Sequence, residues 1–292
     1  MSLQVKIPNS LISLISNIRN FWHNYDQGQY IEMIPYDKPM GAGTYHPATV
    51  FGCFKPNSFV HYVQPSRRPK DARKGQNSAR LYIHHQYQVF SGWHKTNLKP
   101  KENLQRVVYR SLNELGIANK YLQWKENNWN STALGAYGKG WELLCNGVEI
   151  AQVTYFNKMG GIELIAPDTE YYNEPTEITY GLERILMSLR QILWEKNIEY
   201  NKVRELAENT LIDLDILQEG LYEKMINTLQ YAEKLIEAKM ISAAYDQYLD
   251  ANNDFNNLDA SGLLGNEKRG YIISLLKNLV NKCCQEIINA QS

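Results

Sequence analysis

Basic residues gather in one short stretch of the chain. Residues 67–80 carry six of them and a single acid, Asp71; the basic residues are Arg67, Arg68, Lys70, Arg73, Lys74 and Arg80. A guanidinium group is planar, and its paired N–H donors match two oxygens of a phosphate. The stretch therefore predicts an anion site that favours phosphate. A solvated basic hairpin is the alternative interpretation.

Strand-like segments flank these cations on both sides. Pro65 and Pro69 restrict φ around the arginine pair, while Gly75 and Asn77 favour a turn. The residues that follow alternate in type, with Leu81, Ile83, Tyr87 and Val89 on one face and His84, Gln86 and Gln88 on the other. We expect a hairpin whose second strand sets neutral amides beneath the arginines.

The chain carries several short motifs in a fixed order, and the basic hairpin is one of them. It reads QPSRRP at 64–69, then R-x-G-x-N-x-x-R, then QYQV. The others are GAGT at 41–44, HP at 46–47, NW at 128–129, LGA at 134–136, GWE at 140–142, TYF at 154–156, GG at 160–161 and EITYGLER at 177–184. In these motifs the chain resembles, from about Phe21 to Leu189, the bacterial glycyl-tRNA synthetase α subunit, a class II aminoacyl-tRNA synthetase family.

The resemblance implies an enzyme that uses ATP to convert glycine, or a similar small amino acid, to an aminoacyl-adenylate and pyrophosphate. The carboxylate of the amino acid attacks the α-phosphate, so fixed positive charge can supply the catalysis without a protein nucleophile. By resemblance, Arg68 or its neighbour Arg67 is assigned to the α-phosphate and Arg184 to the γ-phosphate. An ion pair of Arg184 with Glu183 or Glu177 is the alternative. The further ATP-binding candidates are Arg80, Gln88, Glu177 and Gly181.

Selection of glycine requires an anchor for the ammonium group and a wall that leaves no room for a β-carbon. Side chains of suitable chemistry are Gln86, Gln152, Thr154 and Glu163, with Trp141 as the candidate wall. Glu142 and Glu149 are the candidate ligands of Mg²⁺, which prefers hard oxygen atoms; either could instead be a structural acid. We expect His46, in the glycine-rich turn, to be structural rather than a nucleotide contact.

Three regions depart from the family pattern. The segments 75–83 and 126–133 lack acids that the family usually carries, and its aromatic and acidic block is not found after Leu189. A paralogue that passes the activated amino acid to a non-tRNA acceptor, or a non-catalytic ATP-binding regulatory or scaffold protein, is therefore the alternative reading. We expect poor tRNA charging by this chain alone, and both tRNA and a β subunit stay open as partners.

The elements that position these residues fall into two regions. We expect an α+β, class II synthetase-like catalytic domain at 1–195, with a mostly antiparallel sheet flanked by helices, and an all-α C-terminal domain at 196–292. Periodicity predicts helices at 10–22, 104–115 and from Thr176, strands at 148–156 and 162–165, and extended structure at 121–129. Two further helices, near 214–236 and 271–280, would be separated by an asparagine-rich break at 252–257.

The helix expected at 10–22 carries an apolar stripe from Leu11 to Trp22, and Ser10 can cap it. An ordinary core helix is one interpretation. In the family that the chain resembles, the equivalent helix belongs to the dimer interface, so the resemblance implies a homodimer.

Composition limits the classes of partner and compartment. The 31 Lys and Arg residues balance 31 Asp and Glu residues, so no global field attracts the chain to nucleic acid or a membrane. The four cysteines include the adjacent Cys283 and Cys284, which suit neither a zinc site nor an ordinary disulfide. No secretion signal and no run of ~18 apolar residues is present. We expect a cytoplasmic protein without membrane contact.

Overall fold

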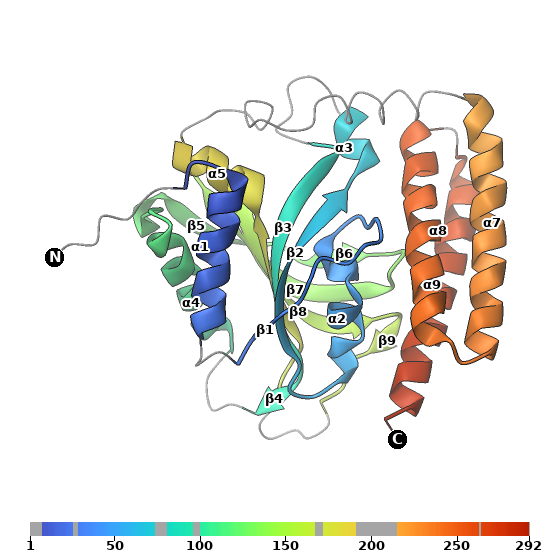
Figure 1. Ribbon diagram of the computed structural model, residues 1–292, viewed down its shortest axis with the longest axis horizontal. Helices are drawn as coiled ribbons and strands as arrows, with labels where there is room; N and C mark the ends of the chain where they lie inside the picture. The colour runs from blue at the N-terminus through green and yellow to red at the C-terminus, as the bar shows by residue number, and fades with distance from the viewer. Residues whose placement is uncertain are drawn as a thin grey trace.

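The computed structural model describes residues 8–25, 29–73, 81–95, 100–166, 172–190, 215–262 and 264–291. In this part of the chain a central sheet carries helices on both faces (Figure 1). One face is covered by α1 (Leu11–Asn24), α4 (Pro100–Glu114) and α5 (Leu182–Arg190). On the other lie α2 (Pro47–Val50) and the long helices α7 (Asp215–Glu237), α8 (Ile241–Ser261) and α9 (Asn266–Asn289). The predicted α+β class with an all-α C-terminal region is confirmed.

The strands of the described residues form a nine-stranded sheet that is antiparallel except at one edge. Its order is β1 (Ile31–Glu32), β2 (Phe59–Arg67), β3 (Ile83–Ser91), β11 (Thr176–Gly181), β8 (Val148–Met159), β7 (Ala136–Cys145) and β5 (Leu122–Glu126). β6 (Trp129–Ser131) pairs with β7, and β9 (Ile162–Glu163) pairs with β8. Only β1 and β2 among these pair in parallel. β4 (His94–Lys95) and β10 (Tyr172–Asn173) form a separate two-stranded ladder.

Alternation along the central strands separates an apolar face from a polar one. On β3, Tyr87 and Val89 enter the apolar core beneath α1, α4 and α5, as predicted. Gln86 and Gln88 point to the opposite face. The register places Thr179 of β11 opposite Gln88 on one side and opposite Gln152 on the other. Polar side chains of three adjacent strands are thus collected on one face of the sheet.

The helices α1 and α4 follow their sequence signals. Ser10 caps α1 through a capping box, in which its hydroxyl accepts from the Ser13 backbone N–H at 3.2 Å. The apolar stripe of α1 is buried in the protein's own core, chiefly through Ile18 and Trp22. α4 ends just before Gly116, whose φ of 96° is a conformation that favours glycine.

Residues 176–181 form a strand, so the prediction that a helix begins at Thr176 is wrong. The segment reads TEITYG, which is rich in β-branched and aromatic residues, the types that favour strands. Ile178 and Tyr180 are buried on one side of β11, and the helix α5 begins only at Leu182. Ile178 is spaced from the leucines of α5 as if it lay on the same side of one helix, and this spacing is coincidental.

The asparagine-rich segment 252–257 lies inside α8, so the predicted break there is also wrong. Asp254 is buried and forms an ion pair at 2.8 Å with Lys224 of α7, which supplies tertiary stabilisation where helix propensity is weak. The chain instead reverses at Lys239 and Gly262, both of which have positive φ.

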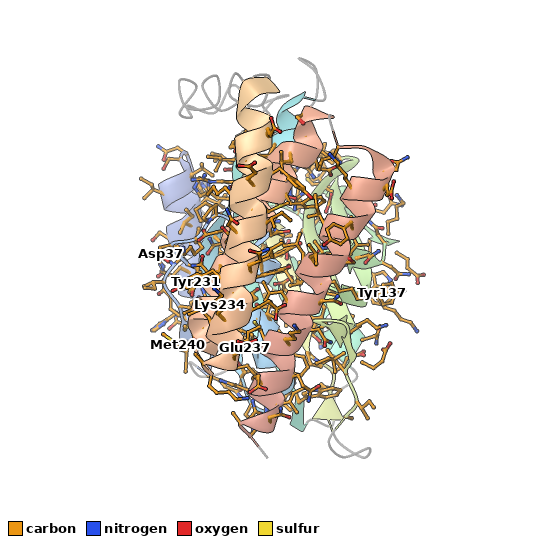
Figure 2. The ribbon with its side chains drawn as sticks, turned by 90° about the vertical axis from the view of Figure 1, so that its right-hand side faces the viewer. Asp37, Tyr137, Tyr231, Lys234, Glu237 and Met240 are labelled. Atoms are coloured by element: carbon orange, nitrogen blue, oxygen red, sulfur yellow. The ribbon has the colours of Figure 1, made fainter. Side chains whose placement is uncertain are left out.

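The three long helices share an apolar core with the sheet. Tyr245 and Tyr248 of α8 pack beside Tyr45 and Phe51 in one continuous cluster, and the Tyr245 hydroxyl donates to the Tyr45 carbonyl at 2.7 Å. The predicted boundary at 195/196 lies outside the described residues. The outer surface of this layer carries the exposed Tyr231 and Met240 (Figure 2). Among the described helices, none is long and apolar enough to span a membrane.

Candidate active site

A cavity of about 270 Å³ opens on the polar face of the sheet. Its walls come from the segment before β2, the β2–α3 junction, strands β3, β8 and β11, and the start of α5; α3 spans Pro69–Arg73. The lining residues are Ala42, Thr44, Arg68, Asp71, Leu81, His84, Gln86, Asn127, Trp129, Glu149, Ile150, Ala151, Gln152, Thr154, Thr179, Gly181, Glu183 and Arg184. The lining is mainly polar. It includes Arg68 from the basic stretch and Arg184 from the motif at 177–184.

Arg68 reaches the cavity from the junction of β2 and α3. Its Nε atom donates to the Gly41 carbonyl at 2.9 Å, and its backbone N–H donates to the Tyr82 carbonyl at 2.7 Å. These two bonds fix both the backbone and the side-chain stem. Because Nε is held in this way, the outer edge of the guanidinium can face a ligand without a large loss of rotamer entropy.

Arg184 reaches the same cavity from the first turn of α5. Its Nη1 atom donates to the Glu149 carboxylate at 3.1 Å and to the Glu149 carbonyl at 3.2 Å. The alternative partners expected from sequence, Glu183 and Glu177, are engaged elsewhere. Glu183 is buried and accepts from the backbone N–H and the Nδ1 atom of His85. The arginine is therefore held by an acid of a neighbouring strand.

Arg67 is not in the wall of this cavity. Arg67 instead lines an adjacent cavity of about 380 Å³ beside α8, and its backbone N–H donates to the Met40 carbonyl. The two cavities share Arg68, Asp71 and Trp129 in their walls. Arg80 lies outside the described residues, as do Gly75 and Asn77. Of the two arginines considered for the α-phosphate, Arg68 is the one that lines the cavity on the polar face of the sheet.

An amide and hydroxyl network forms the floor. The side-chain Oε1 atom of Gln86 accepts from the Gly43 N–H and from the Ser66 hydroxyl, both at 2.7 Å. The side-chain Oε1 atom of Gln88 accepts from the Thr179 hydroxyl at 2.7 Å. Gln88 lies below the lining rather than in it. Gly43 is required by this packing, because a Cβ there would lie 2.2 Å from the Gln88 amide nitrogen.

Glu177 is buried under the same floor. Its Oε2 atom accepts from the Thr44 hydroxyl at 2.6 Å and from the Thr179 hydroxyl at 3.4 Å, whereas Oε1 is buried with no partner among the described residues. Burial raises the pKa of Glu177 to about 7, although the two hydroxyl bonds oppose the shift. Since Thr44 and Thr179 both line the cavity, this carboxyl group lies one side chain beneath it.

The candidate amino-acid contacts divide into two groups. Gln86, Gln152 and Thr154 line the cavity together. Trp141 does not, because alternation on β7 turns it to the opposite face, where it packs edge-on against Tyr155. Glu163 also lies away from the cavity: it is exposed on β9 and pairs with Lys158 at 2.6 Å. The expectations that these two residues wall or anchor the substrate are therefore not met by the geometry.

Glu149 and Glu142 also differ in position. Glu149 lines the cavity, and its carboxylate is partly exposed. Glu142 is not part of the lining: Lys125 and Asn127 hold its two oxygens at 2.9 and 3.1 Å. The described residues contain no group of three or more His, Cys, Asp or Glu that could hold a metal ion. The Glu149 carboxylate nevertheless fits Mg²⁺, because this ion usually binds one or two carboxylates together with substrate phosphates.

His46 is structural, as expected. Its Nδ1 atom accepts from the Ala48 N–H at 3.0 Å and so caps α2. Burial lowers the pKa of His46 to about 4, so the ring is neutral near pH 7. Gly181 lines the cavity, where a Cβ would meet only ordinary contacts, the nearest being the Ile150 carbonyl at 3.6 Å.

A model of the family described as Glycyl-tRNA synthetase alpha subunit matches residues 11–292. The chain belongs to this glycyl-tRNA synthetase α-subunit family. The Glycine--tRNA ligase alpha subunit of Petrotoga mobilis (strain DSM 10674 / SJ95) is 37% identical over an alignment 299 residues long, and the alignment covers 96% of each chain. Because the family match continues from Leu189 to residue 292, the helical region is part of the family's own chain. The departure after Leu189 therefore does not favour the paralogue or scaffold alternatives.

Solved synthetase structures are also similar to this α-subunit family member. The pyrrolysyl tRNA synthetase PylSc of Desulfitobacterium hafniense aligns with a TM-score of 0.44 and 12% identity, over 68% of this chain and 75% of that one. The aspartyl tRNA synthetase from Entamoeba histolytica aligns with a TM-score of 0.43 and 9% identity, over 65% and 57% of the two chains.

The cavity residues that sequence reasoning did not assign to the site of this α subunit include the polar residues Thr44, Asn127, Thr179 and Glu183. Thr44 and Thr179 stand inside quoted motifs, but nothing in their types indicated that both would bond one buried acid. The signal that could have found Thr179 is its place two residues after Glu177, which puts the two side chains on the same face of a strand. That signal was lost because this segment was read as a helix.

Proposed function

We propose that this chain is the catalytic α subunit of a glycyl-tRNA synthetase, which joins glycine to ATP and forms glycyl-adenylate and pyrophosphate. The observation that carries the proposal is that one cavity receives Arg68 and Arg184, which come from the two motifs that hold phosphates in this family. Family membership supplies the reaction, and the cavity supplies a place in which both arginines can meet one triphosphate.

The proposed reaction is a displacement at the α-phosphorus of ATP. A carboxylate oxygen of glycine forms the new bond to phosphorus, and the bond to the bridging oxygen of the β-phosphate breaks to release pyrophosphate. Arg68 neutralises charge that develops on the nonbridging oxygens, and its side chain is already fixed by Gly41. Arg184 exchanges the Glu149 carboxylate for the γ-phosphate, an exchange between two charge-assisted bonds.

Gln86, Gln152 and Thr154 are the proposed contacts of glycine. They line the cavity as neutral donors and acceptors, so they can orient a zwitterion without adding net charge. Glu177 lies beneath Thr44, and its pKa of about 7 allows it to become anionic when an ammonium group arrives above it. In this proposal Gln88 acts from within the floor and Glu177 from beneath it, and Gly181 leaves room for nucleotide beside α5.

Glu149 is the proposed protein ligand of Mg²⁺. The ion would neutralise phosphate charge and stabilise the leaving pyrophosphate. Glu149 fits because its carboxylate is at the cavity wall and becomes available once Arg184 turns to phosphate. Glu142 has a structural role in this proposal, because Lys125 and Asn127 bind its two oxygen atoms.

The proposed partners are a β subunit, tRNA and a second copy of the chain. With zero net charge, this chain offers little general attraction to tRNA, so we propose that a β subunit supplies most of that surface. The apolar stripe of α1 is buried in the protein's own core, so a dimer must form through other residues. Ile12, Ile31 and Ile34 are strongly exposed, and an ion pair of 2.6 Å between Arg19 and Glu32 joins α1 to β1 in this region. Sedimentation of Ile31→Lys and Ile34→Lys variants would test this dimer surface.

Amino-acid-dependent exchange of labelled pyrophosphate into ATP tests the proposed activity. We expect exchange with glycine that exceeds exchange with alanine or serine by at least roughly 100-fold, because one β-carbon must be excluded sterically. Charging of total tRNA with labelled glycine should need an added β subunit. Exchange that does not depend on any amino acid would contradict the proposal.

A further inference from the structure

Helix α8 carries a row of acids that face the segments around the active site. The Asp246 carboxylate accepts from the Tyr36 hydroxyl at 2.5 Å, and Asp250 pairs with Lys38 at 2.7 Å. Further along α8, Asp259 pairs with Lys70 of α3. The C-terminal helical layer therefore contacts the basic motif in addition to the apolar cluster that it shares with the sheet, and α3 and α8 lie near each other at the top of the molecule (Figure 1).

Asp259 connects three elements through one carboxylate. Its Oδ2 atom pairs with Lys70 of α3, and its Oδ1 atom accepts from the Arg269 Nε of α9 at 2.9 Å. The side chain of Asp259 is only 12% exposed. An isolated pair at the surface contributes little, but a mostly buried carboxylate shared by two cations forms a network and loses less entropy per bond.

α3 is directly joined to Arg68. The Asp71 N–H donates to the Arg68 carbonyl at 3.0 Å, so the first turn of α3 begins at the arginine itself. On the other side, Gly41 accepts the Arg68 Nε bond, and a Cβ at Gly41 would lie 3.3 Å from the Asn256 side chain of α8. α8 therefore contacts α3, which begins next to Arg68, and lies close to Gly41, which accepts the Arg68 side-chain bond. A shift of α8 against the sheet would move the arginine.

We propose that Lys70 and Asp259 are positioning residues for the first reaction step. Their ion pair ties α3 to α8 and holds Arg68 in its orientation toward the α-phosphate, so the helical C-terminal region takes part in adenylate formation. This inference rests on the proposed function. Neither residue needs to touch substrate, because the effect passes through the backbone of α3 to Arg68.

The test compares Lys70→Met, Asp259→Asn and Arg269→Met in glycine-dependent pyrophosphate exchange. We expect roughly a three- to ten-fold fall in kcat for the first two, well below the ~100-fold that a misplacement of about 1 Å can cause, with a nearly unchanged KM for ATP. Lys70→Arg keeps the pair and should retain activity. Arg269→Met breaks only the α8–α9 bond and should stay near the wild-type rate.

A double-mutant cycle separates positioning from general structural damage. In an Arg68→Ala background, Lys70→Met should cause no further fall in kcat, since the group that it positions is absent. Additive losses in the cycle would contradict the inference. So would full activity of Asp259→Asn beside a slow Lys70→Met, because that result would assign Lys70 a direct phosphate contact.

The wild-type rate distinguishes this inference from the proposed function. A wild-type enzyme without glycine-dependent exchange would overturn both. An active wild type whose Lys70→Met and Asp259→Asn variants are equally active would overturn the positioning role alone.

Discussion

The Nη1 atom of Arg184 lies 3.1 Å from the Oε2 atom of Glu149 at the wall of the active-site cavity. The two residues come from α5 and β8, and each has a proposed role toward ATP. Both side chains are partly exposed, so their mutual attraction is screened and can be exchanged at modest cost. In the proposed mechanism, the pair keeps the arginine ordered before substrate binds, and the Glu149 carboxylate becomes available when Arg184 binds the triphosphate.

Removing the Glu149 carboxylate should impair metal use. We expect Glu149→Gln to lower kcat for exchange by roughly ten-fold or more and to raise the Mg²⁺ concentration needed for half-maximal rate, because a neutral amide binds Mg²⁺ poorly. A Mg²⁺ titration of the exchange rate measures both effects. The matched control is Glu142→Gln, in which the Mg²⁺ requirement should not change. Equal Mg²⁺ curves for wild type and Glu149→Gln would refute the assignment.

Gly43 should not tolerate a side chain. The added Cβ of Gly43→Ala would lie 2.2 Å from the Gln88 amide, so the floor formed by Gln86, Gln88 and Thr179 must shift. We expect a destabilisation of about 1–3 kcal/mol and a marked loss of exchange activity. Gly220→Ala in α7 is the control: a Cβ there meets nothing within 4 Å, and the protein should gain about 0.5–1 kcal/mol. Thermal unfolding of both variants decides the point.

Glu177 should make stability depend on pH. Burial raises the pKa of Glu177 from 4.5 to about 7, so between these values the unfolded chain ionises this group while the folded protein keeps it protonated. Unfolding then releases a proton, and the free energy of unfolding falls as pH rises through this window. At about 1.4 kcal/mol per pKa unit the contribution is roughly 3 kcal/mol.

Chemical denaturation from pH 4.5 to 8 measures this effect. Glu177→Gln should lack this part of the decline and become relatively more stable as pH rises. Thr44→Val, which removes a hydrogen bond that opposes the rise in the Glu177 pKa, should extend the decline to higher pH. Parallel curves for wild type and Glu177→Gln would show that the carboxyl group is not responsible.

The two adjacent arginines should differ in their tolerance of lysine. Arg68 uses Nε to bond Gly41, and an ammonium group cannot reproduce the planar, several-donor geometry of its guanidinium. We expect Arg68→Lys to lose roughly ten-fold or more in kcat/KM for ATP. Arg67 lines the neighbouring cavity, and Arg67→Lys should lose much less. The reverse order of activities would assign the α-phosphate to Arg67.

Much of this fold follows from local signals. The alternation of Gln86 to Val89, the cap at Ser10 and the end of the helix predicted at 104–115 depend on neighbouring residues only, and the structure agrees with each of them to within a residue. The segment 176–181 misled because apolar residues that serve a strand and then a helix happened to fit one helical stripe. The buried Asp254 in α8 shows the same limit, because its partner Lys224 lies on another helix.

The site was less predictable than the fold. Resemblance indicated which residue types hold phosphates, and Arg68 and Arg184 do line one cavity. Trp141 and Glu163 failed because their position depends on which face of β7 or β9 meets the cavity, which the motif alone does not state. The pairing of Arg184 with Glu149 is set by the packing of α5 on β8, so no local pattern revealed it.

The most direct test of the account is glycine-dependent pyrophosphate exchange in Arg184→Ala and Arg68→Ala, beside Arg19→Ala. Arg19 pairs with Glu32 at 2.6 Å and is not part of the cavity lining, so it matches Arg184 as an ion-paired arginine outside the site. We expect each cavity variant to lose roughly 100-fold or more in kcat/KM for ATP, while Arg19→Ala keeps the wild-type value. Wild-type exchange in both cavity variants would contradict this expectation.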